Sequence, residues 1–219
     1  GKIGVHNGAC MAAADFFEIH IKGSGGHAAI PDLAIDPIPC GAAMVQSLQS
    51  IVSRRVTALE PAVVSITIFD AGSALNVIPG TARLGGTARS FSPEIRKLLE
   101  EAIFDIAQST GEAFDCEVEI DWQPGYPPTV NHANESARAV SVASDVLGSE
   151  NIVTDLLPSM GAEDFAFMLG EKPGSYIWLG AGPSKEGAML HNDRYDFNDD
   201  VLTTGASYWA RLVESELPK

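Results

Sequence analysis

The chain has 219 residues, of which 45% are hydrophobic, so it can bury a substantial core and its composition argues against global disorder. Its formal net charge of −15 argues against nucleic-acid binding, which needs a basic face. No apolar run is long enough to cross a bilayer and no signal peptide is visible, so we expect no membrane association. Three widely spaced cysteines argue against a disulfide framework and favour a cytoplasmic location. Because the first residue is glycine rather than methionine, we expect a piece of a longer protein.

The first part of the chain follows the order strand, helix, strand, strand, helix, strand. Alternating or β-branched segments predict the strands and helical spacing of apolar residues predicts the helices, at 15–21, 38–56, 62–69, 81–89, 94–111 and 115–122. Asp36-Pro37 and Ser92-Pro93 predict the two helix starts, because each places a capping residue before a proline. Gly85-Gly86 predicts a β-bulge in the third strand. This order is the split βαβ pattern of a ferredoxin-like sandwich.

A second α/β segment follows the proline-rich stretch 124–128, which we interpret as a domain boundary. The expected elements are a helix at 135–147, a short strand at 152–154, a short helix after Glu163-Asp164, a strand at 175–180 and a helix at 201–217 capped by Asp199 or Asp200. Two or three strands are too few to close a core, so we interpret this segment as the last part of a larger domain.

Two of the five histidines are candidates for chemistry. His27 lies among three glycines between a strand and a helix, where its ring is free to exchange a proton, although a merely solvated turn histidine fits equally well. His191 precedes an acidic stretch, and a loop histidine beside carboxylates is a candidate metal ligand. Glu163 and Asp164 equally fit the first turn of a helix, where the dipole favours acids.

Seven motifs occur in order along the chain. They are Gly25-Gly26-His27-Ala28-Ala29-x-Pro31, Asp36-Pro37, Asn76-Val77-Ile78-Pro79, Gly86-Thr87-x-Arg89, Tyr126-Pro127-Pro128-Thr129-Val130-Asn131, Met160-Gly161-Ala162-Glu163-Asp164-Phe165 and Leu190-His191-x-x-x-Tyr195-Asp196-Phe197-Asn198-Asp199. In this order they resemble the M20 family of metallo-amidohydrolases and peptidases, within it the branch of hippurate hydrolases, N-acyl-amino-acid amidohydrolases and auxin-conjugate hydrolases. The resemblance covers essentially the whole chain. It implies a ferredoxin-like lid domain at 15–125 that forms a homodimer, and the C-terminal portion of an α/β metallopeptidase catalytic domain at 1–14 and 126–219.

The resemblance also implies roles for single residues. His27 matches the lid histidine that reaches the active site of the second subunit and stabilises the developing oxyanion. Asn76 and Arg89 match substrate-binding residues, and Arg89 is suited to grip a free carboxylate with two prongs. Gly161 and Glu163 match the loop that lines the substrate pocket.

The metal site that the resemblance implies lies largely outside this chain. His191 matches the last ligand of a site for two divalent metal ions, zinc or manganese, whereas the other ligands and the general-base glutamate match positions before residue 1. The expected reaction of the whole protein is cleavage of the amide bond of a small N-acyl amino acid. The alternatives are a carboxypeptidase or aminoacylase of the same family that acts on other amides, or a non-catalytic dimerisation or amino-acid-binding module.

Overall fold

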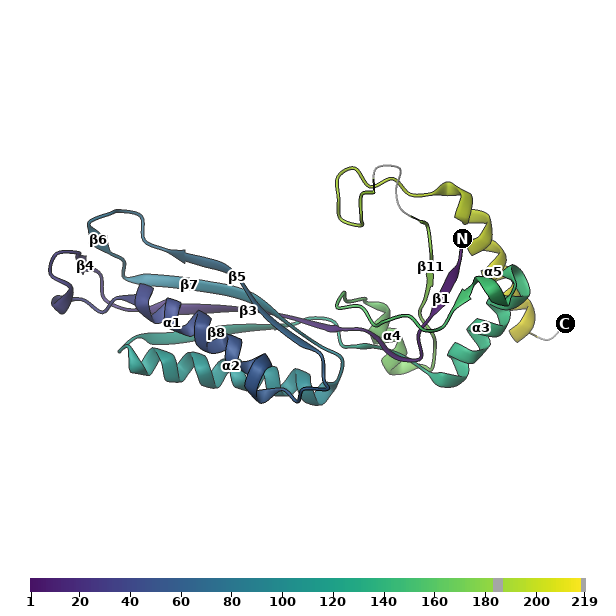
Figure 1. Ribbon diagram of the computed structural model, residues 1–219. Coiled ribbons are helices and arrows are strands. Elements are labelled where there is room, and N and C mark those ends of the chain that lie inside the picture. Colours follow the sequence, from purple (N-terminus) through teal and green to yellow (C-terminus); the bar gives the residue numbers. More distant parts are fainter. Residues whose placement is uncertain (183–186, 218–219) are drawn as a thin grey trace. The chain divides into compact units, whose positions relative to one another are not determined.

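The structure is a computed structural model that describes residues 1–182 and 187–217. These residues form two compact units (Figure 1). Unit 1 consists of Gly1–Cys10, Thr129–Ser159 and the described residues from Asp164 onward, and unit 2 consists of Met11–Pro128 and Met160–Glu163. In the described ranges, no helix combines the length and the apolar character needed to cross a bilayer.

Unit 2 is built on a four-stranded antiparallel sheet. Its strands, in the spatial order β5-β7-β3-β8, are β5 (Ala62–Ala71), β7 (Thr81–Ser90), β3 (Ala13–Lys22) and β8 (Glu117–Pro124). Every neighbouring pair is antiparallel, with Phe17 opposite Gly86 on one side and opposite Trp122 on the other. Together with the two helices between these strands, this order confirms the predicted ferredoxin-like topology.

Two helices cover one face of this sheet. They are α1 (Pro37–Ser50), which continues into the π-helical turn η2 (Ile51–Arg55), and α2 (Pro93–Ala113) (Figure 1). The predicted caps start both helices: an Asp36 carboxylate oxygen accepts a hydrogen bond from the Ile38 amide at 3.0 Å, and the Ser92 hydroxyl accepts one from the Ile95 amide at 3.2 Å.

The alternation of β3 decides which side of the sheet packs on the helices. Phe17, Ile19 and Ile21 point into the core with Met44 and Leu99, whereas the residues between them lie on the open face. Burial of these large apolar side chains is the main favourable contribution to this fold. The open face therefore carries the polar side chains of the sheet.

The predicted bulge lies on the neighbouring strand. The register of β5 against β7 shifts at Thr67, because Ile66 pairs with Gly86 and Ile68 pairs with Gly85. A side chain at Gly86 would come within 2.3 Å of the Ser65 carbonyl oxygen. The two glycines thus allow a bulged β5 to approach β7 closely, and the extra residue belongs to β5 rather than to the glycine pair.

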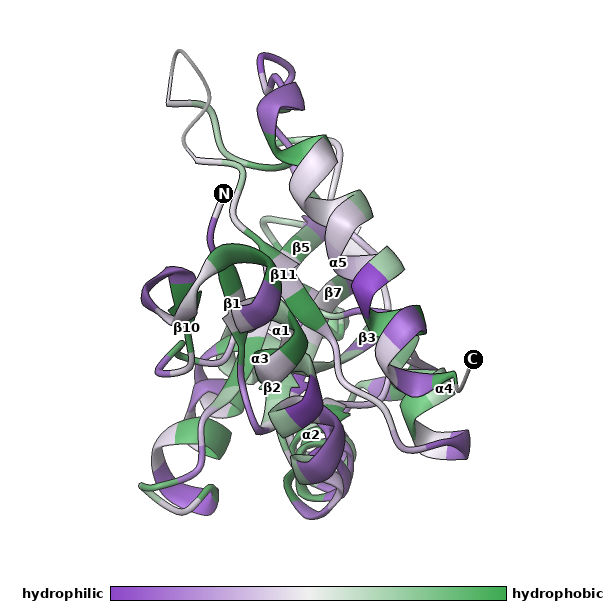
Figure 2. Cartoon of the chain, turned by 90° about the vertical axis from the view of Figure 1, so that its right-hand side faces the viewer, coloured by the Kyte–Doolittle hydropathy of each residue, from purple (hydrophilic) through white to green (hydrophobic). Residues whose placement is uncertain are grey.

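Unit 1 is a small α/β unit. Its three-stranded sheet has the order β10 (Ile152–Val153), β1 (Ile3–Val5) and β11 (Ile177–Leu179), and β1 and β11 are coloured as hydrophobic in Figure 2. The helices α3 (Ala133–Leu147) and α5 (Leu202–Glu216) contact each other, and their buried side chains share a core with β1. The strand β1 was not predicted, because three residues are too few to show a period.

The remaining elements are short. Strand β2 (Gly8–Met11) pairs with β9 (Thr129–Asn131), the turn η3 (Ser149–Asn151) follows α3, and α4 (Phe165–Glu171) follows the predicted loop. The turn η4 (Asp199–Val201) leads into α5. The predicted cap there was wrong: the Asn198 side chain, not Asp199 or Asp200, accepts the hydrogen bond from the Asp200 amide, at 3.1 Å.

Candidate functional site

His27 and Asn76 lie beside each other at one end of unit 2. The two-residue strands β4 (Gly26–His27) and β6 (Val77–Ile78) pair there, with His27 opposite Val77 (Figure 1). The Ala28 amide also donates to the Asn76 carbonyl oxygen at 3.1 Å. Both side chains are exposed. Two residues from separate motifs, about fifty positions apart in sequence, thus form one exposed polar tip.

The ring of His27 is held in one orientation by its own loop. The Ala29 amide donates a hydrogen bond to Nδ1 at 3.1 Å. Because an amide can only donate, Nδ1 must be the unprotonated nitrogen, and the neutral ring carries its proton on Nε2. His27 therefore presents an N–H donor to solvent, which is the chemistry required to stabilise a developing oxyanion.

The glycines before His27 serve close backbone approach. A side chain at Gly23 would come within 2.1 Å of the Ile35 carbonyl oxygen, and one at Gly25 within 2.9 Å of the Ile78 carbonyl oxygen. None of the three glycines has a positive φ. These glycines are needed because the backbone segments approach each other closely, not because the backbone is left-handed. The close approach allows β4 to pair with β6.

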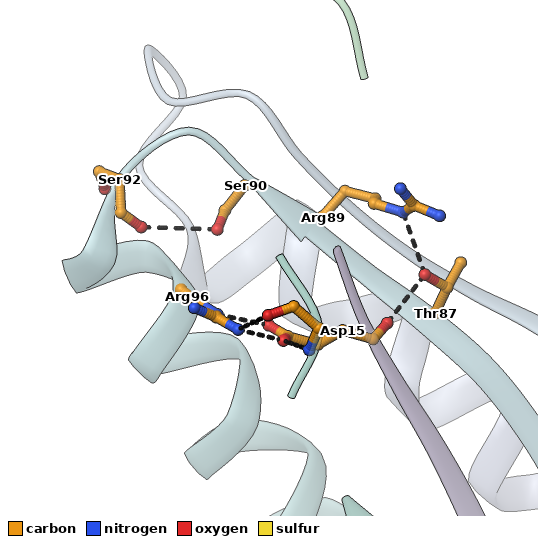
Figure 3. A network of polar contacts seen from close by, with 7 residues as sticks. Asp15, Thr87, Arg89, Ser90, Ser92 and Arg96 are labelled. Carbon is orange, nitrogen blue, oxygen red and sulfur yellow. Dashed lines mark hydrogen bonds and ion pairs between the residues drawn. The ribbon is translucent and has the colours of Figure 1, made fainter. Parts of the chain in front are cut away.

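Arg89 lies near the other end of β7, on the open face of the sheet. Its Nε donates to the Thr87 hydroxyl at 3.1 Å (Figure 3). Its guanidinium carbon lies 5.7 Å from the centre of the Phe16 ring. Among the described residues, no carboxylate forms an ion pair with Arg89. The cation is therefore fixed in place while its two terminal nitrogens stay available for an anion.

A buried ion pair that the sequence analysis missed supports this region. The Asp15 side chain is 2% exposed and receives two hydrogen bonds from Arg96, at 2.8 and 2.5 Å, and one from the Gly125 amide at 3.0 Å (Figure 3). The hydrogen bond to Asp15 raises the pKa of Arg96. The sequence could have indicated this pair. Asp15 alternates with Phe17 and Ile19, which places its carboxylate on the buried face of β3, where it needs a partner.

His27 and Arg89 are separated within unit 2. The strand β7 begins near the β4–β6 tip, where Thr81 pairs with Lys22, and runs on to Arg89. Eight residues at about 3.4 Å each place these two ends of β7 about 27 Å apart. One copy of unit 2 therefore does not bring His27 and Arg89 onto a single small molecule.

The predicted pocket-loop residues precede α4. Gly161 is exposed and its carbonyl oxygen accepts a hydrogen bond from the Ala12 amide at 2.9 Å, and Glu163 is half-buried. Asp164 stands at the N-cap of α4, but its side chain makes no capping hydrogen bond. The structure thus shows a loop tied to the start of β3 by its backbone.

His191 lies in unit 1, in the loop between β11 and η4. It is exposed, and its φ of 65° puts the backbone in the left-handed region, which is uncommon for a residue other than glycine. In the part of the chain that the structure describes, no group of three histidine, cysteine or acidic side chains could hold a metal ion. His191 is therefore a single candidate ligand, and these residues alone do not fit a catalytic metal centre, which uses about three.

A hollow of about 730 Å³ on unit 2 contains none of the predicted site residues. Some of its charged lining residues pair with charges of the same face: Lys22 with Glu117 at 2.7 Å, and Arg83 with Glu18 at 3.2 Å. The Glu119 carboxylate also lines the hollow and forms no ion pair among the described residues, so the lining carries an excess of negative charge, which does not favour an anionic ligand.

Residues 4–215 match the model of peptidase family M20/M25/M40. The N-acetylcysteine deacetylase of Bacillus subtilis is 38% identical over 213 residues, which are 97% of this chain and 54% of the relative. The hippurate hydrolase of Campylobacter jejuni is 38% identical over 212 residues, 97% of this chain and 55% of the relative. The chain thus spans about half the length of the curated relatives it matches.

A solved structure agrees with this match. The Bacillus subtilis YXEP protein, described as a dinuclear metal binding peptidase from the M20 family, superposes with a TM-score of 0.78 at 29% identity. The superposition covers 98% of this chain and 54% of that one. Because the family model covers nearly every residue and the fold agrees with a family member, the chain belongs to peptidase family M20/M25/M40.

Proposed function

We propose that this chain forms the lid domain, residues 15–125, and the C-terminal portion of the catalytic domain, residues 1–14 and 126–219, of a metal-dependent amidohydrolase. The whole protein would cleave the amide bond of N-acyl amino acids. The observation that carries this proposal is Arg89, an ordered guanidinium whose terminal nitrogens face no carboxylate in the described part of the chain. The two relatives described above are named for N-acyl amino acids, substrates that retain a free carboxylate.

Each candidate residue has a task in this proposal. Arg89 would bind the carboxylate of the amino acid through two parallel hydrogen bonds. His27 would donate from Nε2 to the oxygen of the attacked carbonyl, with Asn76 beside it as a second polar contact to the substrate. Gly161 and Glu163 would line the pocket.

We also propose that two copies of the chain complete each other's sites. The separation of about 27 Å along β7 supports this idea, because His27 and Arg89 of one copy cannot reach one small substrate. If His27 of one subunit serves the substrate held by Arg89 of the other, both groups act at once. A two-fold homodimer is the usual symmetry for such an exchange.

The edges of the sheet favour β5 as the dimer contact. The edge strand β8 carries two carboxylates that form no ion pair among the described residues, Glu119 and Asp121, and these would repel a second copy. The edge strand β5 is ten residues long, half of them β-branched, and it carries the partly exposed apolar side chains Ile68 and Phe69. A long apolar edge with unpaired backbone groups is suited to pairing with its own copy.

The metal site would be formed by ligands from the whole protein rather than by this chain alone. A divalent ion, zinc or manganese, supplies a Lewis acid and an activated water when it is bound. Within the described residues, His191 would give one ligand. We propose a cytoplasmic location, which the odd number and wide spacing of the three cysteines support.

The experiment is an assay of the longer protein that contains this chain. Purified enzyme is incubated with hippurate and with N-acetylcysteine, before and after removal of divalent metal by a chelator. We expect release of the free amino acid that stops on chelation and returns with Zn²⁺ or Mn²⁺. Cleavage of peptides but not of N-acyl amino acids would favour the carboxypeptidase alternative, and no cleavage at all would favour a binding module.

A further inference from the structure

Thr87 joins Arg89 to the backbone of the neighbouring strand. Its hydroxyl donates to the Asp15 carbonyl oxygen at 2.9 Å and accepts from the Arg89 Nε at 3.1 Å (Figure 3). Thr87 lies directly opposite Phe16 in the sheet, and Phe16, Thr87 and Arg89 share the open face. The threonine and the aromatic ring therefore hold the guanidinium at two different points.

The direction of these hydrogen bonds is fixed by chemistry. A carbonyl oxygen only accepts, so the single proton of the Thr87 hydroxyl is committed to Asp15. The lone pairs of the hydroxyl then face the Arg89 Nε–H, and each hydrogen bond polarises the other. The hydroxyl cannot turn away from Arg89 without losing its bond to Asp15.

The other end of this chain of hydrogen bonds is anchored. The Asp15 side chain is buried and bonded by Arg96 and by the Gly125 amide. A side chain at position 125 would come within 2.2 Å of the Ala14 carbonyl oxygen, so the backbone is also closely packed here. Four segments thus meet at Asp15: the start of β3, the end of β7, the first turns of α2 and the end of β8.

We propose that Thr87 is a positioning residue that presents Arg89 to a carboxylate end-on, through its two terminal nitrogens. With Nε occupied by Thr87, a side-on approach through Nε is closed, and the two Nη atoms remain for a planar anion. The geometry thereby selects substrates whose free carboxylate can meet both Nη atoms. This inference rests on the proposed function for its substrate, but not for the orientation of Arg89.

The orientation can be measured on this 219-residue chain without any activity. Proton exchange of the Arg89 Nε–H with water is followed by NMR in the wild type, Thr87→Val, Thr87→Ser and Thr67→Val. Valine keeps the β-branched shape without the hydroxyl, serine keeps the hydroxyl, and Thr67 is a matched control whose hydroxyl contacts the Gly85 carbonyl oxygen at 3.5 Å. We expect faster exchange in Thr87→Val alone. Equal exchange in all four proteins would overturn the proposal.

The second measurement uses the longer protein with hippurate and its methyl ester. We expect Thr87→Val to raise KM for hippurate about tenfold, the size expected for losing one hydrogen bond to a charged group, with kcat little changed. The ester should be affected much less, Thr87→Ser should restore the hippurate KM, and Thr67→Val should resemble the wild type. An equal loss for acid and ester, or no rescue by serine, would overturn the proposal. An inactive wild type would instead count against the proposed function, while the exchange rates still decide the orientation.

Discussion

The guanidinium of Arg89 offers a planar pair of donors that a lysine ammonium cannot reproduce. In Arg89→Lys the bond to Thr87 and one of the two prongs to the substrate are lost. We expect binding of an N-acyl amino acid to weaken by about 1.5–3 kcal/mol, the range for hydrogen bonds to charged groups. The measurement is kcat/KM in the longer protein for the free acid and for its neutral amide, which should lose much less.

Arg54→Lys serves as the control for this substitution. Arg54 is exposed, and its Nη1 donates to the carbonyl oxygen of the adjacent Ser53, so its replacement should change neither substrate. If Arg89→Lys reduces kcat/KM equally for the acid and the amide, Arg89 does not bind the carboxylate, and its role would be confined to the sheet.

How far the site follows from the sequence depends on how its residues are connected. His27 stood out because it lies in a glycine-rich loop, whereas Asn76 became a candidate only through the family resemblance, and the structure brings the two loops together. The Asp15–Arg96 pair was not predicted, although the period of β3 marked Asp15 as buried. Any of the 14 lysines and arginines could have been its partner, because sequence carries no record of which helix turn faces which strand.

At the level of elements, the sequence predicted the features that depend on contacts between residues close together in the chain. Asp36 and Ser92 cap their helices as expected, since a cap is a contact between residues two or three apart. The short strands β1, β2 and β9 were missed. They are too short to show an alternating pattern, and they are stabilised by pairing with strands that are distant in the sequence. The bulge was assigned to the glycines rather than to Thr67 for a similar reason: the glycines provide the space and the facing strand uses it.

Two neighbouring buried cysteines, Cys40 on α1 and Cys116 just before β8, predict a response to alkaline pH. Burial raises the pKa of the Cys40 thiol to about 12, and burial also raises the pKa of Cys116. The folded state thus holds these protons at pH values where the unfolded chain has released them, so stability falls as pH rises above about 9. The Cys40 thiol alone should lower the free energy of unfolding by about 1.4 kcal/mol per pH unit in that range, and Cys116 should act in the same direction.

Urea unfolding of the 219-residue chain at pH 8, 9 and 10 measures this effect. Cys40→Ala lowers stability at every pH through the space it leaves, but it should flatten the decline above pH 9 because one titrating group is gone. An identical decline in the wild type and Cys40→Ala would show that the Cys40 thiol does not control it.

The two edges of the unit 2 sheet predict which strand mediates association. Ile68 on β5 is 37% exposed, and Ile68→Lys would place a charge from each copy at a two-fold contact. We expect the dimer dissociation constant to rise roughly 100-fold, since like charges at an interface cost several kcal/mol. Sedimentation velocity across a concentration series measures it. Glu119→Lys on β8 is the matched control and should leave the dimer intact; loss of the dimer in that variant instead would assign the contact to β8.

At the scale of the whole molecule, unit 1 leaves apolar surface uncovered. Leu202, Trp209 and Val213 lie along α5 and are more than half exposed, while Tyr208 on the same helix is buried against α3. A helix with two apolar faces is typical of one that packs between two layers. This pattern supports the proposal that unit 1 is part of a larger catalytic domain, in keeping with relatives about twice as long.

The last prediction concerns what this chain does by itself. His191 is a single exposed candidate ligand, and the described residues include no group of three that could hold a metal, whereas a catalytic zinc site uses about three protein ligands and a water. We expect the 219-residue chain not to hydrolyse hippurate with added Zn²⁺ or Mn²⁺, and its Zn²⁺ binding by calorimetry to be close to that of His191→Ala. The longer protein should bind Zn²⁺ and hydrolyse hippurate, and His191→Ala should weaken both the binding and the hydrolysis in that protein. Metal-dependent turnover by the 219-residue chain alone would contradict the division of the site between this chain and the rest of the protein, because one histidine cannot hold and activate the metal without the other ligands.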